Sequence, residues 1–458
     1  MKKLWLYALI LILPASSALA VDLRISGDRI YLQAREEPLQ SILRRLSQQG
    51  IRVRVDPQLN PLVSANFADR DLREAIAEIV KPYDHVLVWE KTPAGTSFFR
   101  LAEIQVFRPG KKEAIQDLSP RAFSLARDQK DGSMFVKDEI LLRLKPGTNI
   151  ETLLRRIGGT IIDKNEALGI YKVRLPPDSD IPAIRDQIAA SPGIVQAGPD
   201  FVYPVTGLYP SDLPSHATET ATGFRQNSKV SVAVLDSGLL PEVGAGGFVI
   251  AQLDAVSPDQ PMTDNIGHGT QMALLASGLI KPSGAKKEEG GQIPVIAIRA
   301  MDDNGYTSDF TILKSIDFAL EKGARVISLS WGSEKRSDFL EIILDYAASK
   351  GAVIVASAGN EPTGKPVYPA AYPSVIGVGA AYPSGQVWEQ SNYGSSVDLY
   401  APGFATMPVG YKGEPGIYGG TSVAAAFAAN RIAAYLTKNP ESGLNEIRKA
   451  LNLKKAAN

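Results

Sequence analysis

The sequence contains no cysteine in 458 residues. That absence excludes disulfide scaffolds, thiolate zinc sites, iron–sulfur clusters and a cysteine nucleophile. Histidine is scarce as well, and His85, His216 and His268 stand far apart along the chain, so we expect no metal site with several histidine ligands. An excess of one charge is also missing, because 49 basic residues balance 49 acidic ones. We therefore expect no nucleic-acid partner.

Long apolar runs are missing after the first twenty residues. The chain starts with two lysines, an apolar run over 4–14 and small residues that end in Ala18-Leu19-Ala20. This is the layout of a secretory signal peptide with an A-x-A cleavage site, and the run is shorter than the ~20 residues of a membrane span. We expect residues 1–20 to be removed and the mature protein to be secreted or periplasmic, with no membrane span.

A helix–strand pattern occurs twice between residues 21 and 109. Apolar residues at helical spacing precede short alternating strands in both copies, at Leu39, Ile42, Leu43 and Leu46 and again at Leu72, Ala75, Ile76 and Ile79. The run EPLQSILRRLSQQGIRVRVDPQLNPLVSANFADRDLREAIAEIV resembles the short N-terminal domain of secretins and TonB-dependent receptors. The resemblance implies an envelope protein partner bound through 21–109. The alternative is a small α+β domain used only in folding.

A second small α+β domain is predicted over 134–204, after a polar linker over 110–133. Its pattern is strand–helix–strand, repeated once, with turns at Pro146-Gly147 and Pro192-Gly193. This order predicts a ferredoxin-like arrangement. By itself the arrangement says nothing about function.

The sequence pattern changes at about residue 223, where short apolar runs begin to alternate with amphipathic segments. The runs are continuous, as in strands buried on both faces, and comprise Val230–Leu235, Val295–Ile298, Val326–Leu329, Ala352–Ala356 and Val375–Val378. The alternation predicts a doubly wound α/β domain with a mainly parallel sheet over 223–458. Active sites of such sheets lie at the carboxyl ends of the strands.

Three candidate catalytic residues lie where that rule points. Asp236 ends the first strand, His268 opens a helix in DNIGHGT, and Ser422 opens another in YGGTSVAAAFAA. Each alone has an ordinary explanation: a turn, a structural histidine, or a helix N-cap. Together they follow the order Asp, His, Ser, which is one of the few known triad orders. An acyl hydrolase on another α/β fold would need the order Ser, Asp, His.

Four motifs around these residues resemble those of the subtilisin-like serine proteases, over roughly residues 223–440. They are Asp236-Ser237-Gly238, Gly267-His268-Gly269-Thr270, Ser357-Ala358-Gly359-Asn360 and Gly420-Thr421-Ser422. The resemblance implies that His268 takes the proton of Ser422 and that Asp236 orients the imidazole. It also implies an oxyanion hole formed by the Asn360 amide and the Ser422 N–H.

The same resemblance implies two backbone edges that bind an extended substrate. They are Asp303-Asn304-Gly305 and Ser330-Trp331-Gly332. Trp331 departs from the small or aliphatic residue usual there, and it either covers the primary pocket or packs on the core. Ala426 departs from the usual proline in the helix after the serine, which affects local rigidity and leaves the mechanism intact.

The unit at 134–204 resembles the propeptides of this family, in the runs DEILLRLKPGT and SPGIVQAGPDFVYPV. Such propeptides assist folding, occupy the cleft and are cut off autocatalytically. We expect the cut in the stretch after Pro204, which includes a linker predicted over 205–222 and is rich in turn-forming and small residues. The alternative is an accessory domain that stays attached.

The sequence thus predicts an exported serine endopeptidase made as a zymogen, with protein or peptide substrates and its own propeptide as a partner in cis. The alternative is a catalytically silent, subtilase-like binding or scaffold protein of the cell envelope. The chemistry requires no cofactor or metal. A structural Ca²⁺ is left open without assigned ligands, since the sequence has no compact Asp/Asn-rich loop of EF-hand type.

Overall fold

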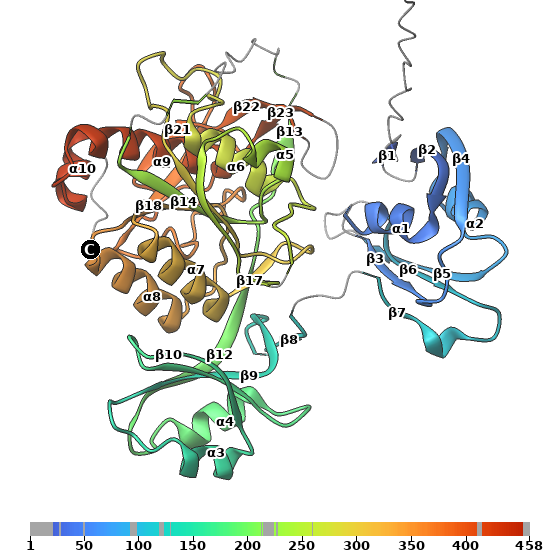
Figure 1. The fold of residues 1–458 in the computed structure, drawn as a ribbon, viewed down its shortest axis with the longest axis horizontal. Helices are drawn as coiled ribbons and strands as arrows, with labels where there is room; N and C mark the ends of the chain where they lie inside the picture. Colours follow the sequence, from blue (N-terminus) through green and yellow to red (C-terminus); the bar gives the residue numbers. More distant parts are fainter. Residues whose placement is uncertain are drawn as a thin grey trace, which may run out of the picture. The chain divides into compact units, whose positions relative to one another are not determined.

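The computed structural model describes residues 22–26, 29–48, 51–91, 99–118, 123–128, 130–211, 213, 224–225, 228–258, 260–409 and 415–451. The chain forms two compact units, Met1–Pro120 and Arg121–Asn458 (Figure 1). The predicted signal peptide, residues 1–20, lies outside the described residues. Within the described ranges, no helix has the length and apolar character to cross a membrane.

The first unit combines two helices with two small sheets. One sheet is antiparallel, in the order β1 (Asp22–Ser26), β2 (Arg29–Pro38), β4 (Leu62–Asp71). The other has the order β5 (Asp84–Lys91), β6 (Phe99–Phe107), β3 (Arg52–Val55), β7 (Gln116–Asp117). The helices are α1 (Leu39–Gln48) and α2 (Leu72–Ile79).

Both predicted helical stripes lie in the core of this unit. Every residue of the two stripes is buried, together with Val53 and Val55 of β3. Strands β2 and β4 were not predicted, because their alternation of apolar residues, at Ile30, Leu32 and Ala34 and at Val63, Ala65 and Phe67, is short and leads into charged residues. Asp71 ends β4 and caps α2, since its carboxylate accepts from the N–H groups of Arg73 and Glu74.

The stretch predicted as a linker over 110–133 contains regular structure at both ends. A short 3₁₀ helix η1 (Lys112–Ala114) precedes β7, which pairs with β3 in the first unit. In the second unit, β8 (Leu125–Arg127) pairs with β9 (Met134–Leu144). Polar residues here satisfy their backbone groups on sheet edges, a role that composition does not reveal.

The N-terminal part of the second unit is an antiparallel sheet with two helices. Its elements along the chain are β9, α3 (Glu151–Ile157), β10 (Thr160–Asn165), β11 (Ile170–Arg174), α4 (Ile181–Ile188) and β12 (Ile194–Pro204). The strand order is β10-β11-β9-β12. Helices α3 and α4 cover one face with a core of their own (Figure 1). Side chains of the other face, such as Leu141 and Ile170, join the core beneath α7 and α8.

A seven-stranded parallel sheet forms the centre of the second unit, as predicted for a doubly wound domain. Its order is β15 (Val249–Asp254), β16 (Val295–Arg299), β14 (Ser231–Asp236), β18 (Ala324–Leu329), β19 (Val353–Ser357), β20 (Val375–Ala381), β21 (Leu399–Pro402). After β14 the chain forms β15 and β16 on one side of that strand, and it later forms β18 on the other side. The carboxyl end of β14 is therefore a switch point, where such sheets bind ligands.

Helices pack on both faces of this sheet (Figure 1). One face is covered by α6 (His268–Ser277) and α9 (Thr421–Lys438), and the other by α7 (Asp309–Glu321) and α8 (Asp338–Ser349). Peripheral elements are α5 (Pro241–Gly244), α10 (Leu444–Ala450), β17 (Tyr306–Ser308) and a small sheet of β13 (Tyr209–Pro210), β23 (Gly416–Gly419) and β22 (Phe404–Met407). β17 pairs with β12, which joins the two parts of the unit.

Candidate active site

The structure brings Asp236 and His268 together at the carboxyl end of β14. Asp236 is the last residue of that strand and His268 is the first residue of α6. The Nδ1 atom of His268 lies 2.7 Å from Oδ1 of Asp236, and both side chains are buried. Gly238, two residues later, has φ +128°, and a Cβ there would lie 1.9 Å from the Thr263 carbonyl oxygen. The turn that positions Asp236 therefore requires glycine.

Asp264 holds this arrangement together, and sequence reasoning missed it. Its Oδ1 accepts from the Ser237 hydroxyl and the Gly267 N–H, each at 2.8 Å. Its Oδ2 accepts from the N–H and the hydroxyl of Thr270 at 2.8 and 2.6 Å. One buried carboxylate thus ties the residue after Asp236 to the first turn of α6. The local signal was an aspartate ahead of a turn, since an aspartate side chain can accept from the N–H groups two and three residues on, here Ile266 and Gly267.

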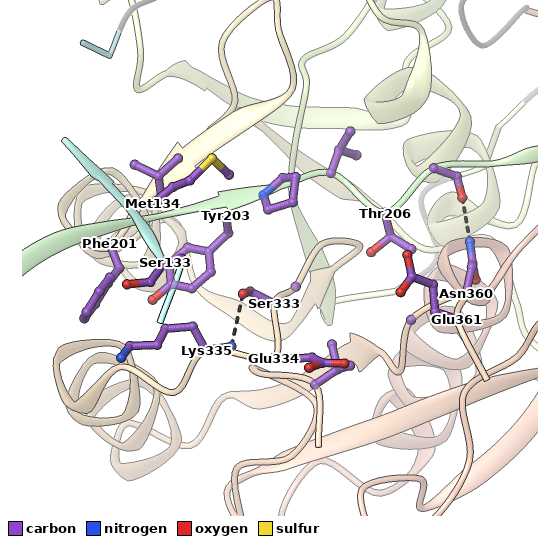
Figure 2. A pocket seen from close by; sticks show the side chains of 18 of the residues that line it. Ser133, Met134, Phe201, Tyr203, Thr206, Ser333, Glu334, Lys335, Asn360 and Glu361 are labelled. Atoms are coloured by element: carbon purple, nitrogen blue, oxygen red, sulfur yellow. Dashed lines mark hydrogen bonds between the residues drawn. The ribbon is translucent and has the colours of Figure 1, made fainter. Parts of the chain in front are cut away.

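Ser422 and Asn360 lie at the start of α9 and after the end of β19. Ser422 is the second residue of α9 and is fully buried. The Oδ1 atom of Asn360 accepts from the N–H and the hydroxyl of Thr421 at 2.9 and 2.8 Å. Because these two donors fix the amide oxygen, the amide NH₂ is directed to the other side, where it donates to the Gly207 carbonyl oxygen at 2.6 Å (Figure 2).

The chain's own residues 202–207 run along the two predicted substrate edges. The Val205 N–H donates to the Gly305 carbonyl oxygen at 2.8 Å, and the Thr206 N–H donates to that of Ser330 at 3.2 Å. Val205 also forms an antiparallel bridge with Trp331. The Ser422 hydroxyl donates to the Thr206 carbonyl oxygen at 3.4 Å. An extended segment of the chain therefore lies across the site, with one carbonyl directed at Ser422.

The remaining predicted edge residues make other contacts. The Asp303 carboxylate accepts from Arg299 at 2.8 Å, and the Asn304 N–H donates to Asp302 at 3.0 Å. Gly332 lines a cavity of about 400 Å³ beside Thr206 and Asn360 (Figure 2). Trp331 is fully buried in the core beneath α7 and α8, so it packs on the core, one of the two alternatives.

Buried carboxyl groups lie beneath the segment that crosses the site. Asp309 accepts from the Tyr203 hydroxyl at 2.6 Å, and burial raises its pKa to about 8, with the charge of Asp200 adding to the shift. Burial also raises the pKa of Asp200, against the opposing effect of Lys172. Burial disfavours the charged form of Lys172, yet its pKa is raised because Asp200 and Glu139 lie 3.4 and 2.7 Å away. Asp309 therefore holds its proton more tightly than an exposed aspartate does.

A metal site does not emerge from the described parts of the chain. Their His, Asp and Glu side chains form no group of three or more that could hold a metal ion. The structural Ca²⁺ left open above stays without assigned ligands.

Comparison with known proteins identifies the two parts of the second unit. Residues 227–457 match the subtilase family, over half of the chain. The chain belongs to the subtilase family. Residues 123–200 match the fervidolysin N-terminal prodomain. The family match covers the sheet and the helices that carry Asp236, His268 and Ser422.

Individual relatives agree with this assignment. A thermophilic serine proteinase of Bacillus sp. strain AK1 is 27% identical over 346 residues, which cover 73% of this chain and 86% of the relative. Subtilisin E of Bacillus subtilis strain 168 is 34% identical over 226 residues, or 46% of this chain and 57% of the relative. The crystal structure of fervidolysin from Fervidobacterium pennivorans shares the fold, with a TM-score of 0.56 and 23% identity over 72% of this chain and 59% of that chain.

These matches confirm, at the level of the family, the prediction of a serine endopeptidase made with a prodomain. The chain spans little more than half the length of subtilisin E and fervidolysin. The two family matches cover residues 123–200 and 227–457. They do not support the resemblance of 21–109 to the secretin and TonB-receptor domain. That resemblance and the envelope partner it implies stay predictions.

The buried carboxyls predict that the contact between the prodomain and the cleft weakens as pH rises. In the intact chain Asp309 holds its proton up to about pH 8, whereas a water-exposed aspartate loses it near pH 4. Opening of the contact therefore releases a proton, and the opening constant rises up to ~10-fold per pH unit below pH 8 and levels off above it. Hydrogen exchange of residues 199–207 in the Ser422→Ala chain, at pH 6 to 9 and corrected for intrinsic rates, measures this.

Asp309→Asn is the matched control for the pH effect, because it removes this titration and keeps the size of the side chain. We expect the opening constant of this variant to rise less steeply with pH, and the remaining dependence to come from Asp200. An equal dependence of opening on pH in both chains, or slower opening at higher pH, would contradict the prediction that Asp309 releases the proton.

Proposed function

We propose that this protein is an exported serine endopeptidase that cuts its own chain after Thr206. The observation that carries the proposal is the course of residues 202–207 through the site, with the Thr206 carbonyl oxygen 3.4 Å from the Ser422 hydroxyl. Export is proposed from the sequence of residues 1–20 alone. The proposed substrates are extended protein or peptide segments, since backbone pairing along two edges accepts many sequences.

In this proposal Ser422 attacks the carbonyl carbon of Thr206 and gives its proton to His268. The Thr206 oxygen becomes an oxyanion, and collapse of the intermediate breaks the bond to Gly207 as His268 returns the proton to the new amine. Water then hydrolyses the acyl-enzyme by the same steps in reverse order. The 2.7 Å contact with Asp236 orients the imidazole and stabilises its charged form.

The oxyanion is proposed to bind the Asn360 amide and the Ser422 N–H. Support comes from the two Thr421 donors, which hold the Asn360 oxygen and leave its NH₂ for the cleft. In the uncut chain this NH₂ donates to the Gly207 carbonyl oxygen, one residue beyond Thr206. We infer that it shifts to the Thr206 oxygen as negative charge develops there, because a preorganised donor interacts most strongly with the charged atom.

The ferredoxin-like part is proposed to act as a prodomain that blocks the cleft until it is cut away. Its sheet packs on the side of the catalytic domain that carries α7 and α8, and β12 continues into the cleft. The Asp200 carboxylate accepts from the N–H of Phe310 at 3.0 Å, which satisfies a free donor in the first turn of α7. The prodomain would thus extend from about residue 123 to Thr206, slightly longer than the predicted 134–204.

Ser422→Ala is expected to leave the chain uncut and to lower peptide hydrolysis by about 10⁶-fold, as loss of the nucleophile does in subtilisin. Wild-type protein should yield a product that starts at Gly207 and should react with a fluorophosphonate probe. Intact mass, N-terminal sequencing and casein hydrolysis measure these outcomes. Ser349→Ala, at an exposed position near the end of α8, is the matched control and should behave as wild type. Wild-type protein that is neither cut nor labelled would instead indicate the silent scaffold.

Asn360→Ala is expected to lower kcat by about 10²–10³-fold with little change in KM, the effect of losing an oxyanion-hole asparagine in subtilisin. The reason is that its NH₂ acts on charge that is present only in the transition state. Steady-state kinetics on a peptide substrate measures this, with exposed Asn439→Ala as the control. A rise in KM at unchanged kcat would show that Asn360 only binds substrate.

A further inference from the structure

A closed pocket receives Tyr203, the third residue before Thr206. The Tyr203 ring lies against the Trp331 ring with centroids 5.4 Å apart and an interplanar angle of 35°. Its hydroxyl donates to Oδ1 of Asp309 at 2.6 Å. All three side chains are fully buried. The pocket therefore contacts both the face of the ring and the hydroxyl at its tip.

The groups that form this pocket belong to the peptidase part of the chain. Asp309 is the first residue of α7, and its second oxygen accepts from the Ser337 hydroxyl at 2.6 Å. Ser337 is in turn the N-cap of α8, where its oxygen accepts from the Leu340 N–H at 3.2 Å. Two helix starts thus fix the carboxyl group from behind. A cut after Thr206 would remove Tyr203 and leave Asp309, Ser337 and Trp331 in place.

We propose that the mature enzyme selects tyrosine at the fourth residue before the cut bond and that Asp309 determines this preference. The inference rests on the proposed function, which places the cut after Thr206 and makes Tyr203 that fourth residue. A substrate strand that replaces 203–206 along the same edges brings its own fourth side chain to Trp331 and Asp309. Tyrosine fills the ring site and gives Asp309 a hydroxyl donor.

Phenylalanine would fill the same space and leave the carboxyl oxygen without that donor in a site closed to water. An unsatisfied buried acceptor of this kind lowers kcat/KM by about tenfold or more. Alanine would leave the face of Trp331 uncovered as well, and so it should be a poorer residue than either aromatic. The expected order is tyrosine, then phenylalanine, then alanine.

The test compares three internally quenched peptides, Val-X-Pro-Val-Thr-Gly-Leu, with X as tyrosine, phenylalanine or alanine. They copy residues 202–208, so X reaches the Tyr203 pocket, and mass spectrometry reports the bond that is cut. We expect kcat/KM for tyrosine to exceed that for phenylalanine by at least about tenfold. Phenylalanine cut as fast as tyrosine would overturn the inference and leave the proposed peptidase intact. If none of the peptides is cut, both this inference and the proposed peptidase activity are contradicted.

Asp309→Leu keeps the approximate size of the side chain and removes the acceptor. In this variant the tyrosine-to-phenylalanine ratio should fall to one or below. Tyr203→Phe in the prodomain is the matched control, because it yields an identical mature enzyme with an unchanged ratio. An unchanged tyrosine-to-phenylalanine ratio in Asp309→Leu would show that another group binds the tyrosine hydroxyl. If this variant does not mature, the wild-type comparison still decides.

Discussion

Backbone pairing between residues 202–207 and the two edges of the cleft is the interaction on which the other features of the site depend. It aligns Thr206 with Ser422 and Tyr203 with Asp309, and it uses main-chain atoms of Gly305 and Ser330. Main-chain pairing holds an extended segment in register whatever its side chains are. The proposed function uses this geometry twice, for inhibition by the chain itself and for recognition of other substrates.

The preorganisation of the site comes from residues that do not contact the segment. Asp264 joins the turn after β14 to the start of α6, and Thr421 orients Asn360. Both use buried hydrogen bonds at helix starts, which are stronger and more directional in a dry interior. At the prodomain contact the situation differs, because burial raises the pKa of both Asp200 and Asp309 there. Buried hydrogen bonds thus fix the proposed catalytic residues, whereas the contact proposed to block them is predicted to weaken as pH rises.

The parallel sheet and the candidate catalytic residues could be predicted from the sequence because their signals are local. Val230–Leu235 is continuously apolar, and Asp236, His268 and Ser422 each stand in a short motif. Asp309 was missed, since its role depends on Tyr203, and the role of Asp264 depends in part on Ser237; only the fold brings these partners near. Strands β2 and β4 were missed because the alternation of their apolar residues is short and leads into charged residues. The sequence therefore did not predict side-chain contacts between distant residues or strands with a short apolar pattern.

The proposed function requires that the segment in the cleft is cut by the same chain that contains it. The most direct test follows processing of freshly refolded wild-type protein over a hundredfold range of concentration, with N-terminal mass spectrometry at each time. An intramolecular cut is first order, so we expect one half-time at all concentrations and a first product that starts at Gly207. A half-time that shortens in proportion to concentration would show that one molecule cuts another, and a first cut elsewhere would contradict cleavage after Thr206.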